Sequence, residues 1–164
     1  MEKADAVYLW CMYPKLETSR IRQEFWTRFG QYMAPVLSAE GEKINWVNYK
    51  TGERNISFRM EADNRSASIA IVFDHPDELI RDLYFEQLLE LKNMLTAQAA
   101  QQWNWQRTVH DEGRKMVSKV YQTLEGVSIF RQEDWPEMIS FLKERIIALD
   151  AFWSQAKYAF EALR

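Results

Sequence analysis

The apolar residues near the start of the chain recur at the spacing of a helix. From Leu16 to Met33 they fall on one helical face. Thr18 or Ser19 is a candidate N-cap, and Pro35 predicts the end of the helix. Gly30 costs about 1 kcal/mol relative to alanine inside a helix, so it predicts the close approach of another backbone. The face consists of Ile21, Phe25, Trp26, Phe29, Tyr32 and Met33.

Between residues 44 and 74 the hydrophobic period changes to two, the pattern of strands with one buried face. Three strands are predicted, with turns at Lys50–Glu53 and Asp63–Arg65. Consecutive strands of this kind form an antiparallel meander. The alternating positions are Ile44, Trp46 and Asn48 in the first strand, Ile56, Phe58 and Met60 in the second, and Ala67, Ile69, Ile71 and Phe73 in the third.

After Pro76 the period is helical again, and an apolar stripe from Leu79 to Leu95 predicts a second helix. Alternation then returns over Trp103–Val109 and Met116–Leu124, with the loop His110–Lys115 between them. This arrangement predicts a β-hairpin.

Val127–Phe130 is either a short strand or an apolar lead-in to the last helix. Asp134 and Glu137 have the spacing of a capping box, and Pro136 suits the first helical turn. The last helix is predicted to run to about Leu163.

The predicted order is helix, three-stranded antiparallel meander, helix, β-hairpin and long C-terminal helix. Strands that are adjacent along the chain between helices favour the α+β class, with a single layer of sheet packed on helices. The 164 residues contain no linker or low-complexity tract, so one domain is expected over residues 1–164.

The single cysteine, Cys11, excludes an intrachain disulfide and favours a reducing compartment, which we expect to be a bacterial-type cytoplasm. Its apolar neighbours indicate a small buried residue rather than a nucleophile. No secretory signal pattern is present. The apolar runs are far shorter than the roughly 18 to 20 residues that cross a bilayer, so no membrane partner is expected.

The net charge is -3, and no stretch of the chain is strongly basic, which lowers the expectation of nucleic-acid binding. The cations of the predicted first sheet, including Lys50 and Arg59, are interspersed with acids. This pattern favours a solvated face with cross-strand ion pairs. Binding of a nucleic acid or an acidic partner by these cations is the alternative.

Several catalytic classes lack their motifs. The five glycines stand too far apart for a dinucleotide-binding loop, a P-loop or a serine nucleophile elbow. Cys11, His75 and His110 are scattered and form no zinc-ligand spacing. We therefore expect no cofactor and no metal site, and we interpret both histidines as surface or capping residues.

Carboxylates leave one catalytic alternative. The predicted order resembles nuclease-like domains with a PD-(D/E)XK site, in which acids and a lysine hold a divalent metal and a water. Glu61, Asp63 and Asp74 are the candidate acids. Pro76 occupies the place of the lysine, and the strand Ser66–Phe73 contains no acid. This alternative is therefore a divergent and degenerate nuclease fold, and outside it no catalytic residue is assigned.

Five stretches resemble the bacterial domain of unknown function family 4268 (DUF4268) from about Ser19 to the end of the chain. The resemblance implies a stand-alone cytoplasmic protein or a tail behind a separate nuclease-like domain. It implies a non-catalytic accessory or recognition role near nucleic-acid metabolism or defence, and it supplies no catalytic residues. The stretches are FWTRFGQYM (25–33), LSAEGEKINWVNYKTGE (37–53), FRMEADN (58–64), EDWPEMISFLKERIIALDAFW (133–153) and YAFEAL (158–163).

Seven Trp, seven Tyr and nine Phe either fill the core or mark an interface. The favoured hypothesis is an interaction module that binds a protein partner or forms a homodimer. Trp46, Trp103 and Trp105 are also candidate stacking platforms for single-stranded nucleic acid, and with Lys50 and Arg59 they are the candidate binding residues. If the chain has an interface, the first places to look for it are Phe25, Trp26, Phe29, Trp103, Trp105, Phe152 and Trp153.

Overall fold

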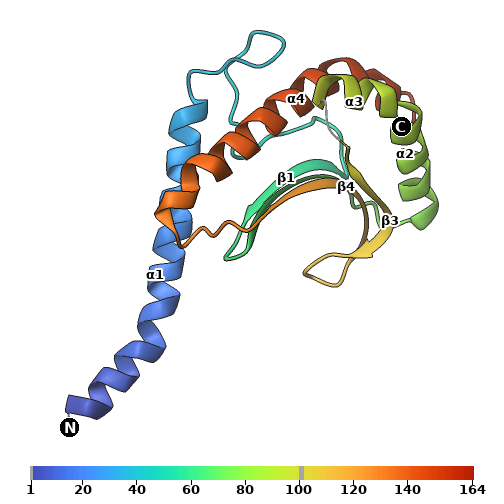
Figure 1. The fold of residues 1–164 in the computed structure, drawn as a ribbon. Coiled ribbons are helices and arrows are strands. Elements are labelled where there is room, and N and C mark those ends of the chain that lie inside the picture. Colours follow the sequence, from blue (N-terminus) through green and yellow to red (C-terminus); the bar gives the residue numbers. More distant parts are fainter. Residues whose placement is uncertain (1, 100–101) are drawn as a thin grey trace.

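The computed structural model describes residues 2–99 and 102–164, with side chains from residue 15 onward, so the Cys11 side chain lies outside the described part. Figure 1 shows helices and a sheet in one layered arrangement, which confirms the α+β class. The elements are α1 (Glu2–Met33), β1 (Ile56–Ala62), β2 (Ser66–Phe73), α2 (Glu78–Glu90), α3 (Lys92–Ala99), β3 (Asn104–His110), β4 (Met116–Glu125), the short 3-10 helix η1 (Gln132–Asp134) and α4 (Trp135–Glu161).

The four strands form one antiparallel sheet in the order β1-β2-β4-β3. The β1–β2 hairpin pairs Ile56 with Phe73 at one end and Ala62 with Ala67 at the other. Helices α2, α3 and α4 lie over one face of the arched sheet, and no helix of the described residues covers the opposite face (Figure 1). Two strand edges are therefore free of a fifth strand, one on β1 and one on β3.

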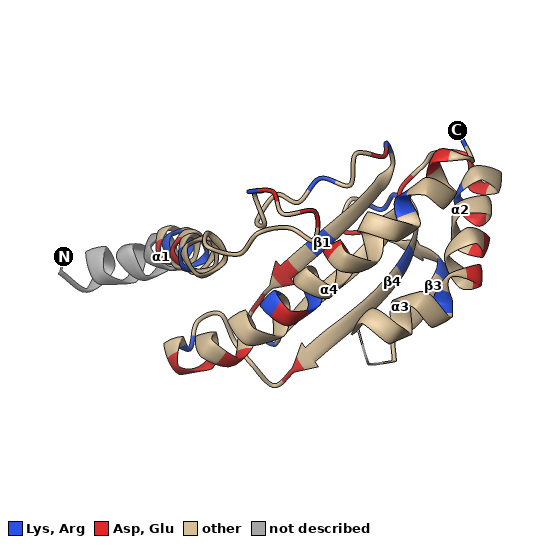
Figure 2. Cartoon of the chain, turned by 90° about the horizontal axis from the view of Figure 1, so that it is seen from above, with Lys and Arg blue, Asp and Glu red and all other residues tan. Residues whose placement is uncertain are grey.

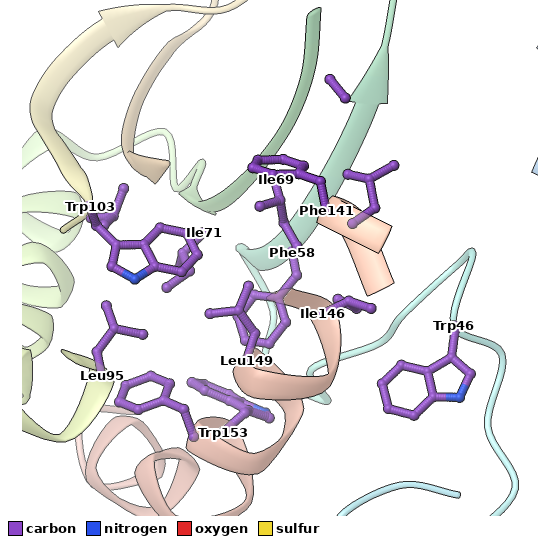
Figure 3. Packing of buried hydrophobic residues seen from close by; sticks show 14 of the residues in the cluster. Trp46, Phe58, Ile69, Ile71, Leu95, Trp103, Phe141, Ile146, Leu149 and Trp153 are labelled. Carbon is purple, nitrogen blue, oxygen red and sulfur yellow. The ribbon is translucent and has the colours of Figure 1, made fainter. Parts of the chain in front are cut away.

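The core lies between the sheet and α4. Phe58, Ile69 and Ile71 project from the strands toward Leu149 and Trp153 of α4 (Figure 3). Most of the expected interface aromatics belong to this core, since only Trp26 and Trp105 among them are more than slightly exposed. The interface interpretation is therefore wrong for Phe25, Phe29, Trp103, Phe152 and Trp153, because packing and not association accounts for their burial.

Helix α1 begins well before Leu16, so Thr18 and Ser19 lie inside the helix and are not caps. The helix ends at Met33, as Pro35 predicts. Gly30 does meet a close neighbour, but a side chain and not a backbone. A Cβ at Gly30 would lie 3.5 Å from Cγ2 of Val47.

The strand predicted over residues 44–48 is absent, and the meander has two strands instead of three. The side chain of Asn45 explains the difference. Its Oδ1 accepts hydrogen bonds from the backbone N–H groups of Val47 and Asn48, both at 3.1 Å. These local bonds form an Asx turn, which replaces the ladder bonds of a strand.

The remaining findings concern the second helix, the segment before the last helix and the start of the last helix. The helix predicted from Leu79 to Leu95 is divided at Leu91 into α2 and α3, and Asp77 caps α2 through the N–H of Leu79. Of the two alternatives for Val127–Phe130, the strand is absent, and the segment leads into η1 and α4. Asp134 precedes α4 without the predicted cap bond, because its carboxylate accepts from Ser128 N and Arg131 Nε instead. None of the helices in the described residues is long and apolar enough to cross a bilayer.

Candidate functional site

The segment 34–55 between α1 and β1 contains no helix or strand, yet α4 holds it firmly. Asp150 of α4 is 7% exposed, and its two carboxylate oxygens accept from the Tyr49 hydroxyl at 2.6 Å and the Ala39 N–H at 2.7 Å. Lys157 of α4 bonds to Glu40 at 2.6 Å. We call this segment the clasped loop.

A hollow of about 570 Å³ lies between the clasped loop and α4. The carboxylate of Asp150 is the buried charge in its wall, and both of its oxygens are already bonded within the chain. Burial and the hydrogen bond to Asp150 raise the pKa of Tyr49 well above its ordinary value. Tyr49 is therefore a poor proton donor, and the pair is suited to holding the loop rather than to acid–base chemistry.

The raised pKa of Tyr49 predicts a pH effect on stability. Above pH 10 the tyrosine ionises in the unfolded chain while Tyr49 stays neutral in the folded one, so stability is full below about pH 10 and falls as pH rises. Because Tyr49 is partly exposed, its share of this loss is a fraction of the roughly 1.4 kcal/mol per pH unit that one fully linked proton gives. Denaturant unfolding between pH 9 and 11 should show a shallower decline for Tyr49→Phe than for the wild type; equal slopes would contradict the assignment.

The free edge of β1 provides a second candidate site, and two hydrogen bonds define its geometry. The N–H of Asp63 donates to the carbonyl of Ser66 at 2.9 Å, and the N–H of Asp74 donates to the carbonyl of Asn55 at 3.1 Å. Paired residues of an antiparallel ladder alternate between bonded and non-bonded pairs. With the observed register, the odd-numbered residues of β1 therefore bond to β2, and the even-numbered residues direct their backbone groups to the free edge.

Side chains cap both ends of this edge. The Thr51 hydroxyl donates to the carbonyl of Ile56 at 2.8 Å, and Arg22 of α1 donates to the carbonyl of Ala62 at 2.9 Å. Both acceptors are even-numbered, which agrees with the assigned alternation. Between the caps, the outward backbone groups without a partner among the described residues belong to Phe58 and Met60.

A hollow of about 580 Å³, which we call the edge hollow, lies beside these groups. The clasped loop runs past the free side of β1 (Figure 2). The loop runs antiparallel to β1. Its Thr51 hydroxyl bonds to Ile56 at the start of the strand, and the earlier residue Val47 lines a hollow together with Ala62 at the end of the strand. No backbone hydrogen bond joins the loop to β1. The hollow is lined by Val47, Asn48, Tyr49, Lys50, Phe58, Arg59, Met60 and Glu61.

The edge hollow brings together two of the predicted binding residues, Lys50 and Arg59. Arg59 is paired with Asp74 at 3.3 Å, whereas Lys50 and Glu61 are exposed and make no ion pair within the described residues. Sequence reasoning missed Met60, Thr51 and Arg22. The alternation of β1 could have indicated Met60, but both caps depend on contacts between distant parts of the chain.

The three predicted tryptophans lie elsewhere. Trp46 is 2% exposed and donates to the carbonyl of Val36. Trp103 is 8% exposed, and its Nε1 has no hydrogen-bond partner among the residues that the structure describes. Neither ring presents a face on which a base could stack. Trp105 is half-buried, with Phe85 against its ring and Lys92 Nζ 5.8 Å from its centroid.

The three candidate nuclease acids do not form one site. Asp63 and Asp74 lie at opposite ends of the β1–β2 hairpin, more than about 20 Å apart at the rise of a strand. Two backbone N–H donors lower the pKa of Asp63 against the opposing effect of burial, and Asp74 pairs with Arg59 and Lys115. Within residues 15–99 and 102–164, no three His, Cys, Asp or Glu side chains could jointly hold a metal. The arrangement gives the nuclease alternative no metal centre there.

The uncovered face of the sheet contains a further hollow of about 450 Å³. Its floor consists of the small side chains Ser68 and Ala70. Lys119 Nζ lies over the Tyr121 ring at 4.5 Å, and Arg59 is engaged with Asp74. The cations at this face are thus already occupied by neighbours in the chain.

The fold is of the α+β class, and its strongest candidate site is the edge hollow beside β1. The chain belongs to the family described as domain of unknown function DUF4268, whose model matches residues 21–157. The resemblance of the sequence to that family is thereby confirmed. No curated protein and no solved structure gives a significant match to the chain.

Proposed function

We propose that this protein is a non-catalytic interaction module of the cytoplasm that binds a protein partner through the edge hollow. The observation that carries the proposal is a pair of strand residues, Phe58 and Met60, whose outward backbone groups have no partner in the described part of the chain. They lie at the same hollow as Lys50 and Glu61, whose side chains make no ion pair there. A strand edge that is covered or already paired would leave no backbone N–H or carbonyl group for a partner. Exposed edges that persist in proteins are ready-made templates for pairing with another chain.

The charges of the edge hollow support a protein partner over a nucleic acid. Nucleic-acid affinity depends on cations that neutralise phosphates. Here the carboxylate of Glu61 lines the same hollow as Lys50 and Arg59, and Arg59 is already paired with Asp74. A role in nucleic-acid metabolism or defence would therefore come through the bound protein.

A second copy of the chain is a partner that the same edge could accept. Two β1 edges paired antiparallel would make a two-fold symmetric dimer. Sedimentation velocity over a hundredfold concentration range tests this version. A concentration-dependent dimer that Met60→Pro abolishes supports it, and a strict monomer at the highest concentration removes it.

Binding of other proteins is tested with a phage-displayed library of random dodecapeptides on the immobilised full chain. Enriched peptides are expected to lose about tenfold in affinity when Lys50→Glu reverses the charge at the hollow. Lys43→Glu is the matched control, since Lys43 is an exposed lysine of the same loop that does not line the edge hollow. A library without enrichment, or peptides that bind both variants alike, would contradict the proposed function.

A further inference from the structure

We infer that β1 accepts an extended segment of the partner protein as a fifth, antiparallel strand with a defined charge order. This inference rests on the proposed function and specifies its binding mode. Strand addition uses backbone hydrogen bonds for affinity and alternate side chains for specificity. The edge hollow offers both outward backbone groups for the hydrogen bonds and side chains for the specificity.

The backbone groups set the length of the added segment. The Thr51 and Arg22 caps occupy the carbonyls of Ile56 and Ala62, which leaves the N–H and carbonyl groups of Phe58 and Met60 for the partner. Bonding between two such residues and an incoming strand needs about five partner residues, with alternate residues facing β1. Neighbouring strands lie about 4.8 Å apart. The edge hollow lies on the side of β1 where the added strand would pair, and the clasped loop, whose Tyr49 ring stacks on Phe58 at 5.2 Å, lines its other side.

The other free edge of the sheet is less suited to strand addition. The register of β3 shifts between Gln106 and Val109, an irregularity that disrupts a regular edge. Arg107 in this region pairs with Asp82 and Glu86 of α2. The edge of β1 has no such shift over its seven paired residues.

The side chains around the hollow specify the partner's chemistry. Val47, Tyr49 and Met60 are half-buried and offer apolar surface to one face of the added strand. Lys50 is adjacent to Thr51 and so lies at the Ile56 end, whereas Glu61 lies at the Ala62 end. With Thr51 at Ile56 and the loop antiparallel to β1, Lys50 falls opposite Ser57, four residues from Glu61, or roughly 13 Å along the strand.

The charge order follows from strand direction. Antiparallel pairing is the more stable per residue, and it places the start of the partner segment at the Ala62 end of β1. A basic residue of the partner then meets Glu61, and an acidic residue about four positions later meets Lys50. The segment therefore has the pattern base, apolar, any residue, apolar, acid.

The test compares Met60→Pro with Met60→Ala, using the peptides enriched on the wild-type chain as probes. Both variants remove the Met60 side chain, but only proline removes the N–H that points to the free edge. Because that N–H takes no part in the β1–β2 ladder, proline is compatible with this position. Isothermal titration is expected to show binding at least about tenfold weaker for Met60→Pro than for Met60→Ala, as one lost hydrogen bond predicts.

A second measurement requires no variant of the protein. In an added strand, every second N–H group of the peptide bonds to β1. N-methylation of those residues is expected to abolish binding, whereas N-methylation of the residues between them is expected to leave it unchanged. The enriched peptides should also carry the basic residue about four positions before the acidic one. Equal affinity of Met60→Pro and Met60→Ala, or no periodicity with N-methylation, would overturn strand addition and leave the interaction function standing. Absence of any enriched peptide would reject both.

Discussion

Replacing Trp153 with alanine is expected to lower the free energy of unfolding by about 3–5 kcal/mol, the usual cost of removing a buried tryptophan. Trp153 is 4% exposed and lies between the rings of Phe58 and Phe160, at centroid distances of 5.7 and 5.3 Å. Its Nε1 donates to the carbonyl of Thr51 at 2.7 Å. The substitution thus opens a cavity in the core and releases the residue that caps β1.

Thermal unfolding should show the Trp153→Ala effect as a decrease in Tm of roughly 6–20 °C for a chain of this size. Trp153→Phe is the matched control, because it keeps an aromatic ring and removes the donor to Thr51. Its expected cost is about 1–3 kcal/mol, which is that of an unsatisfied carbonyl. A Trp153→Ala variant within 1 kcal/mol of the wild type would show that α4 does not hold the loop and the sheet together through this residue.

Asp150→Ala is expected to cost about 1.5–3 kcal/mol, because Asp150 provides a charged acceptor for two donors of the clasped loop. The Tyr49 hydroxyl and the Ala39 N–H both lose their partner. Ala39 is exposed and regains a bond to water, which keeps the loss below that of a fully buried pair. Urea unfolding of the two proteins gives the difference directly.

A double-mutant cycle with Tyr49→Phe isolates the contact between Asp150 and Tyr49. We expect a coupling energy of at least about 0.5 kcal/mol, as for residues in one hydrogen-bond network. Asp150→Asn is the conservative control, since its single amide oxygen replaces only one of the two acceptors. Additive single effects would mean that the carboxylate does not hold the loop through Tyr49.

Elements that depend on local pattern are well predicted from the sequence. The stripe containing Phe25, Phe29 and Met33 identifies the helical face that is buried, and the alternation in β1 and β2 identifies which side chains enter the core. The exception is the strand expected over residues 44–48. Its hydrophobic alternation is compatible with a strand, but the side chain of Asn45 bonds to the backbone and produces a turn.

The candidate site is predicted only in part. Lys50 and Arg59 are identified as binding residues by charge, and the structure places both at the edge hollow. The reason for the hollow lies in contacts that join distant residues. Tyr49 and Asp150 are 101 positions apart, and Arg22 and Ala62 are 40 apart, so neither pair has a signal in local sequence.

Backbone amide hydrogen exchange of the free, full-length chain tests the central claim of an open β1 edge most directly. The N–H groups of Ser57, Arg59 and Glu61 bond to β2, so they are expected to exchange slowly. Those of Phe58 and Met60 point to the edge hollow and are expected to exchange much faster. Equal protection of all five amides in a dilute sample would show that the edge is already closed and would contradict the account.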